Sequence, residues 1–137
     1  MVTDILSYID NCPYLSDFYT NIDFLGKNQY SLSVSGRGKS QVVKKYTDGD
    51  ALVKSIYKMR LRLPFGIDKK KNYENSKLCE NVENWVKENS TSGILPELSG
   101  DKIPVSIEIT FLRDSVSYFS DTAVYTADIA LTYYQTK

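Results

Sequence analysis

The sequence predicts an α+β fold, in which an antiparallel sheet of about four strands has two helices packed on one face. Several segments alternate apolar and polar residues with a period of two, which is typical of strands with one buried face. Two other segments repeat apolar residues at helical spacing. One-sided strands need their apolar face covered, and the two helices are the elements that can cover it.

The clearest strand lies between Leu52 and Leu63, where the sequence is LVKSIYKMRLRL. Because successive side chains of a strand point to opposite faces, this segment has one apolar and one basic face. The apolar set is Val53, Tyr57, Met59, Leu61 and Leu63, and the basic set is Lys54, Lys58, Arg60 and Arg62. At about 3.3 Å per residue the strand spans roughly 40 Å. Such a length favours a subunit of a polymeric assembly over an enzyme with a pocket.

The chain begins with an amphipathic helix, predicted from Val2 to Asn11. Its apolar residues share one face, Thr3 or Asp4 suits the first turn, and Pro13 ends the helix. The next segment, 14–26, is aromatic and acidic without a sustained period. We expect a packed, extended connection there.

A first strand is predicted from Tyr30 to Ser35, where apolar residues alternate with serines. The glycine-lysine segment Gly36–Ser40 looks faintly like the end of a phosphate-binding loop. It lacks the first glycine and is not followed by a helical pattern, so we interpret it as a turn. A strand from Val42 to Thr47 then leads into Asp48-Gly49, a strong hairpin signal, before the long strand.

After the long strand, Phe65–Tyr73 is predicted to be an exposed loop that carries Lys69–Lys71. A second helix is predicted from Asn75 to Glu88, because apolar residues recur there at helical spacing. We interpret Trp85 as a core anchor of this helix in preference to a ligand platform. The segment Gly93–Lys102 is irregular.

Two more strands are predicted, from Ile103 to Phe111 and from Ala123 to Tyr133, joined by a polar connection over Leu112–Thr122. The residues expected to face the core are Ile103, Val105, Ile107, Ile109 and Phe111 in the first strand, and Ala123, Tyr125, Ala127, Ile129, Leu131 and Tyr133 in the second.

The charge is balanced overall but not along the chain. The 17 basic and 17 acidic residues cancel, yet Arg37 to Lys71 holds eleven basic and three acidic residues, a local balance of +8 that leaves −8 elsewhere. One interpretation is a solvated strand face beside a lysine-rich loop. Another is a two-sided subunit that meets an acidic surface on a neighbour or partner. A third, nucleic-acid contact, is weakened by the lack of a binding motif and a sequence pI near 6.3.

The sequence contains no histidine and two cysteines, Cys12 and Cys79. Histidine is the commonest general base and metal ligand, and no pair of carboxylates stands out in its place. We therefore expect no enzymatic activity, no cofactor and no metal. The two thiols are interpreted as reduced and half-buried. A single domain over residues 1–137 is expected, without a membrane span or secretion signal.

Several short segments, taken together and in order, carry a resemblance. They are Asn21-Ile22-Asp23-Phe24-Leu25-Gly26 leading to Tyr30-Ser31, Lys45-Tyr46-Thr47-Asp48-Gly49 before the long strand, Tyr73-Glu74-Asn75-Ser76 at the start of a helix with Trp85 near its end, and the closing Leu131-Thr132-Tyr133-Tyr134-Gln135. With these segments the chain resembles the tail terminator, or tail-completion, proteins of long-tailed bacteriophages. In phages of Gram-positive bacteria, such proteins are often labelled minor capsid or minor structural proteins.

The resemblance implies a structural protein. Such proteins form a ring, commonly a hexamer, on the head-proximal end of the tail tube, where they end tube polymerisation and present the docking surface for the head connector. The implied partners are copies of the chain itself, the tail tube protein and the head–tail connector protein, with no membrane and no small-molecule substrate. DNA enters only as the genome that passes through the ring lumen. The implied location is the virion, with assembly in the host cytoplasm.

Rings form through contacts between different surfaces of neighbouring subunits. We expect these contacts on basic segments, and the candidate residues are Arg37, Lys39, Lys54, Lys58, Arg60, Arg62, Lys69, Lys70 and Lys71. A sheet edge that continues its hydrogen bonding into a neighbour is a further way to join subunits. The alternatives that the sequence leaves open are another head–tail joining protein, a tail tube subunit and a small nucleic-acid-binding module.

Overall fold

The structure is a computed structural model that describes residues 1–35, 39–66, 69–112, 116–119 and 121–136. These residues form two α-helices, one short 3-10 helix and a seven-stranded sheet. In chain order the elements are α1 (Val2–Asp10), η1 (Pro13–Leu15), β1 (Tyr19–Ile22), β2 (Ser31–Val34), β3 (Lys39–Lys45), β4 (Ala51–Pro64), α2 (Lys69–Thr91), β5 (Lys102–Phe111), β6 (Ser117–Phe119) and β7 (Thr122–Gln135). The predicted α+β class is confirmed, whereas the prediction of about four strands is wrong.

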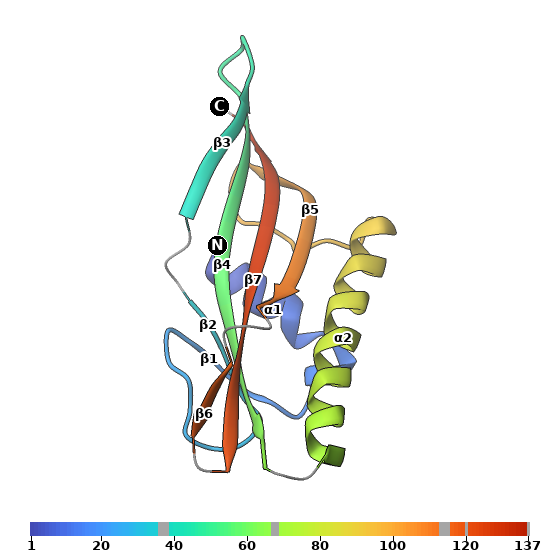
Figure 1. Ribbon diagram of the computed structural model, residues 1–137. Helices are drawn as coiled ribbons and strands as arrows, with labels where there is room; N and C mark the ends of the chain where they lie inside the picture. The colour runs from blue at the N-terminus through green and yellow to red at the C-terminus, as the bar shows by residue number, and fades with distance from the viewer. Residues whose placement is uncertain (36–38, 67–68, 113–115, 120, 137) are drawn as a thin grey trace.

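Two long antiparallel strands, β4 and β7, form the centre of the sheet (Figure 1). They pair over all 14 residues of each strand, from Ala51↔Gln135 to Pro64↔Thr122. The other edge of β4 is shared by β3 and β2, and the other edge of β7 by β5 and β6. β1 pairs with β2 in the parallel direction, so the prediction of a purely antiparallel sheet is wrong.

Three segments that were predicted as connections contain strand residues. β1 lies within 14–26, β6 lies within 112–122, and β3 begins at Lys39, inside the predicted Gly36–Ser40 turn. Strands of four and three residues, such as β1 and β6, are too short to show a period of two. Residues 36–38 of the predicted turn lie outside the described residues.

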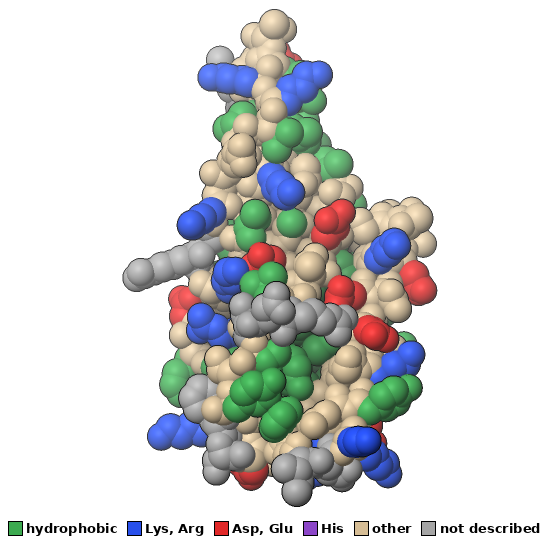
Figure 2. All heavy atoms as spheres, viewed as in Figure 1, with side chains coloured by type: hydrophobic (Ala, Val, Ile, Leu, Met, Phe, Trp, Pro, Cys, Tyr) green, Lys and Arg blue, Asp and Glu red, His purple; other side chains and the backbone are tan. Residues whose placement is uncertain are grey.

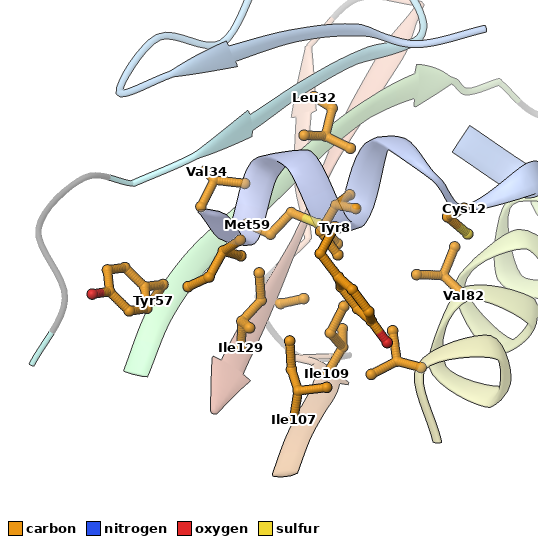
Figure 3. Packing of buried hydrophobic residues seen from close by; sticks show 14 of the residues in the cluster. Tyr8, Cys12, Leu32, Val34, Tyr57, Met59, Val82, Ile107, Ile109 and Ile129 are labelled. Carbon is orange, nitrogen blue, oxygen red and sulfur yellow. The ribbon is translucent and has the colours of Figure 1, made fainter. Parts of the chain in front are cut away.

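Alternation along β4 sorts its residues between the two faces of the sheet as predicted. The apolar set of β4 is buried at 0–8% exposure, and α1 and α2 cover this core face (Figures 1 and 3). Figure 3 shows Leu32, Met59 and Ile129, from three adjacent strands, gathered beside α1. Trp85 of α2 is half-buried and packs on Tyr8 of α1, with ring centroids 5.2 Å apart. Trp85 therefore joins the two helices at the margin of the core.

Helix α2 is longer at both ends than the predicted helix from Asn75 to Glu88. The predicted loop from Phe65 to Tyr73 is therefore wrong in its second half, where Lys69–Lys71 form the first turn of the helix. The sequence pattern misses this turn because lysines near a helix N-terminus oppose the helix dipole and add no apolar period. Buried Asn75, in the second turn of the helix, ties the helix to the end of β4, since its side-chain amide donates to the Pro64 carbonyl at 2.7 Å.

A β-bulge at Val105 reverses the faces of β5. Beyond the bulge, Ile107 and Ile109 are buried as predicted, whereas before it Pro104 lies opposite buried Tyr133 and Ile103 faces outward. Ile103 is 55% exposed and Val105 is 49% exposed, so the prediction that both face the core is wrong. A bulge inserts one residue and shifts the alternation by one, which a strict period of two cannot detect.

The β3–β4 hairpin and the adjoining end of β7 extend beyond the helices (Figure 1). The predicted turn is confirmed: Gly49 has a φ of 95°, and the Tyr46 N–H donates to the Asp50 carbonyl at 2.9 Å. All seven residues of β3 are exposed, including Val42 and Val43 at 57% and 55%. The projecting hairpin therefore presents apolar side chains and lysines to solvent on the same strand.

Two isoleucines test the assignment of the sheet faces. Ile129 of β7 is 0% exposed on the core face, and Ile56 of β4 is 39% exposed on the opposite face. We expect Ile129→Ala to lower the free energy of unfolding by about 2–5 kcal/mol because it leaves a cavity. Ile56→Ala should lower it by less than about 1 kcal/mol. Urea unfolding measures both values, and equal losses would contradict the assignment.

Candidate assembly interface

The face of the sheet opposite the helices, called the outer face below, carries most of the residues predicted to form an interface. Lys54, Lys58 and Arg60 of β4 are exposed there, as predicted, and Lys39 of β3 pairs with Ile56 on the same face. Figure 2 shows basic side chains over β3 and β4, and acidic side chains toward β5 and α2, where α2 also carries basic ones. The outer face is therefore electrostatically two-sided.

Lys58 forms an ion pair with Asp128 of β7, with 2.5 Å between Nζ and Oδ1. The two residues lie opposite each other in the β4–β7 pairing. Their side chains are 47% and 35% exposed, so solvent screens the pair and its contribution to stability is at most about 1 kcal/mol. Part of the Lys58 charge is thus balanced within the chain, which makes Lys54 and Arg60 the stronger cations toward a partner.

Arg62 is held within the chain. Its Nε donates to the Gly26 carbonyl at 2.9 Å, and one of its Nη atoms donates to the Thr122 hydroxyl at 3.1 Å. Gly26 belongs to the connection between β1 and β2, and Thr122 begins β7. Arg62 therefore ties this connection to the sheet, a structural role that the alternating pattern did not indicate.

The other predicted lysines lie away from the outer face. Lys69–Lys71 are exposed on the first turn of α2, at the end of the molecule opposite the β3–β4 turn (Figure 1). Arg37 lies outside the described residues. The structure thus brings Lys39, Lys54 and Arg60 onto one face and separates them from the lysines of α2.

Side-chain contacts at its turn fasten the projecting hairpin to the end of β7. The Tyr134 hydroxyl donates to Asp50 Oδ2 at 2.6 Å. Its ring lies 5.6 Å from the ring of Tyr46, which in turn has Lys44 Nζ 5.2 Å from its centroid. The hydrogen bond to Asp50 is the main reason that the pKa of Tyr134 is raised to about 12, because it favours the protonated phenol.

A groove between β5 and α2 was not predicted from the sequence. It has a volume of about 440 Å³, and its lining includes Glu83 and Ser90 of α2 and Glu108 of β5. The Ile107 N–H, on the edge of β5 turned away from β7, donates to Ser90 Oγ at 3.4 Å, which is long for a hydrogen bond. No local pattern could have revealed this groove, because it depends on β5 being an edge strand.

A second groove, of about 450 Å³, lies between α1 and α2 and is lined by Tyr8 and Trp85 among others. Its carboxylate Asp4 accepts hydrogen bonds from the Ser99 hydroxyl at 3.0 and 3.2 Å. This groove contains none of the residues predicted to form an interface.

The two cysteines are more deeply buried than predicted. Cys12 and Cys79 are free thiols that are 0% and 2% exposed. Burial raises the pKa of the Cys12 thiol, which disfavours the reactive thiolate. A thiol reagent should therefore modify an engineered surface cysteine before either native one.

Replacing Tyr134 with Phe tests the fastening of the hairpin. The pKa of Tyr134 is about 12 in the fold against 10.0 for an ordinary tyrosine. The protonated phenol thus stabilises the fold fully below pH 10 and less as the pH rises through 12. We expect the stability difference between wild type and Tyr134→Phe, from urea unfolding, to be constant near neutral pH and to shrink at alkaline pH. A difference that grows with pH would contradict the assignment.

Alanine variants of Arg62 and Arg60 distinguish a structural role from a surface role. Arg62→Ala removes the hydrogen bonds to Gly26 and Thr122 and should lower the free energy of unfolding by about 1–3 kcal/mol. Arg60→Ala, its matched control on the same face, should change stability by no more than about 0.5 kcal/mol. Chemical denaturation measures both values. An Arg62→Ala variant as stable as the wild type would contradict the structural role of Arg62.

Among the described residues, no group of three or more histidine, cysteine, aspartate or glutamate side chains is arranged to hold a metal ion. In the same part of the chain, no helix has both the length and the apolar character needed to span a bilayer.

No protein-family model matches the chain, and no curated protein matches it either.

Proposed function

We propose that this protein is a structural virion subunit that forms a ring at the head-proximal end of the tail tube of a phage or phage-tail-like particle. The ring stops the addition of tube subunits and provides the docking surface for the head connector. Its partners are further copies of the chain, the tube protein and the connector protein, and the genome passes through its lumen. The subunit assembles in the host cytoplasm and remains in the virion.

The observation that carries this proposal is the part of the sheet that projects beyond the helices, namely the β3–β4 hairpin and the adjoining end of β7. Its edge strand, β3, is exposed on all seven residues and adds two exposed valines to its lysines. An exposed edge strand is a site where a monomer is prone to aggregate, and association with another chain covers it. Together with the two-sided charge of the outer face, such an edge suits a subunit that meets its neighbours through different surfaces.

The placement at the tail end rests on the sequence resemblance. Two of the segments that carry the resemblance meet at the turn of the projecting hairpin, because Lys45–Gly49 forms this turn and Leu131–Gln135 forms the adjoining end of β7. The contact between the aromatic rings of Tyr46 and Tyr134 joins these two segments directly. The residues behind the resemblance therefore support the same part of the molecule that we assign to assembly.

Binding to purified tail tubes tests the proposal. We expect the protein to cosediment with tubes and to stop their elongation, with ring-shaped caps visible at one end by electron microscopy. Arg60→Glu, which reverses an exposed charge on the outer face, should weaken tube binding about ten-fold, equivalent to about 1.4 kcal/mol.

Lys77→Glu is the matched control, because Lys77 is equally an exposed cation but lies on α2. It should bind tubes like the wild type. Failure of the wild-type protein to bind or cap tubes would refute the proposed function. Spontaneous filaments of the purified protein would instead identify a tube subunit.

A further inference from the structure

The sheet has two edge strands, β3 and β5, that lie at the same level. Rows of paired residues run across β3, β4, β7 and β5 on the outer face. Three such rows are Lys39–Ile56–Ala130–Glu108, Gln41–Lys54–Thr132–Ser106 and Lys44–Leu52–Tyr134–Ile103. Within the described residues, no strand pairs with the outward edge of β3 or with that of β5.

The directions of the two edge strands also match. Each strand in the series β3, β4, β7 and β5 runs antiparallel to the next, so β3 and β5 run antiparallel to each other. A second copy, rotated about an axis parallel to the strands, keeps its strand directions. Its β3 would therefore meet β5 of the first copy as an antiparallel pair, which is the pairing of the sheet interior.

The chemistry of the two edges is complementary. β3 carries Lys39 and Lys44 on the outer face, whereas the same face of β5 carries Glu108. At equal level, Lys39 of the second copy would come beside Glu108, at the mouth of the groove whose lining also includes Glu83 and Lys87 of α2. The long hydrogen bond between the Ile107 N–H and Ser90 is weak enough to be replaced by a stronger main-chain bond.

We propose that the β3 edge of one copy pairs with the β5 edge of the next, so that the sheets of neighbouring subunits join into one continuous sheet. The proposal rests on the ring-forming function above and names the two surfaces that form the ring. It is a head-to-tail contact, in which each copy offers β3 on one side and β5 on the other. Because both edges lie at one level, successive copies rise little along the axis, and this favours a closed ring over an open helix.

Cysteine cross-linking tests this pairing. Gln41→Cys and Ser106→Cys place neutral replacements on one row of the outer face and leave Lys39 and Glu108 intact. Within one copy the two sites are three strand spacings apart, roughly 14 Å. A short bismaleimide still joins the two sites between copies if the register of the pairing differs by two residues, roughly 7 Å. It is too short to join the two sites within one copy. We expect the double variant to give a ladder of covalent oligomers, and each single variant to give none.

The matched control pairs Gln41→Cys with Tyr118→Cys, because Tyr118 is exposed but lies on β6, outside both edge strands of the proposed contact. This control should give no ladder. A ladder without tube capping would refute the proposed function and leave the pairing standing. The pairing would be overturned if the protein sediments as rings but gives no cross-linked ladder. It would also be overturned if the protein stays monomeric at millimolar concentration.

Charge reversal gives an independent readout. Lys39→Glu and Glu108→Lys should each weaken self-association about five-fold, as measured by sedimentation, because each places like charges side by side. The double variant restores opposite charges and should associate like the wild type. Independent losses that simply add in the double variant would contradict the contact between Lys39 and Glu108.

Discussion

The pairing between β4 and β7 organises the whole sheet. These two strands pair over all 14 of their residues, and β2, β3, β5 and β6 each attach to one of them. The level of the β3 edge relative to the β5 edge therefore depends on this register. A slip of one residue would expose the apolar set of β4 and bury its lysines.

The same register distributes the charges of the outer face. It places Lys58 opposite Asp128 and leaves Arg60 and Lys54 beside uncharged neighbours on β7, Thr126 and Thr132. The basic strand face therefore contains three kinds of residue. Lys58 is balanced within the chain, Arg62 holds a connection in place, and Lys54 and Arg60 direct their charge outward. An alternating sequence cannot separate these roles, because the partners lie on other strands.

Local patterns predicted the long elements well and the short or irregular ones poorly. The alternation of β4 and β7 and the turn at Gly49 were predicted correctly, since each depends on neighbouring residues. The bulge at Val105, the parallel pairing of β1 and the groove beside β5 depend on distant contacts. Of the predicted interface residues, the sequence could place Lys54 and Arg60 on an exposed face. It could not show that Arg62 is bound within the chain or that Lys69–Lys71 begin a helix.

Amide hydrogen exchange of the assembled protein shows directly whether copies join through the β3 and β5 edges of the sheet. Exchange would be compared between dilute protein and rings, isolated or bound to tubes. We expect the amides of Lys39–Lys45 and of the facing edge of Lys102–Phe111 to become protected on assembly, and those of Tyr19–Ile22 and Ser117–Phe119 to stay unchanged. Unchanged exchange along Lys39–Lys45 in an assembled ring would contradict this expectation.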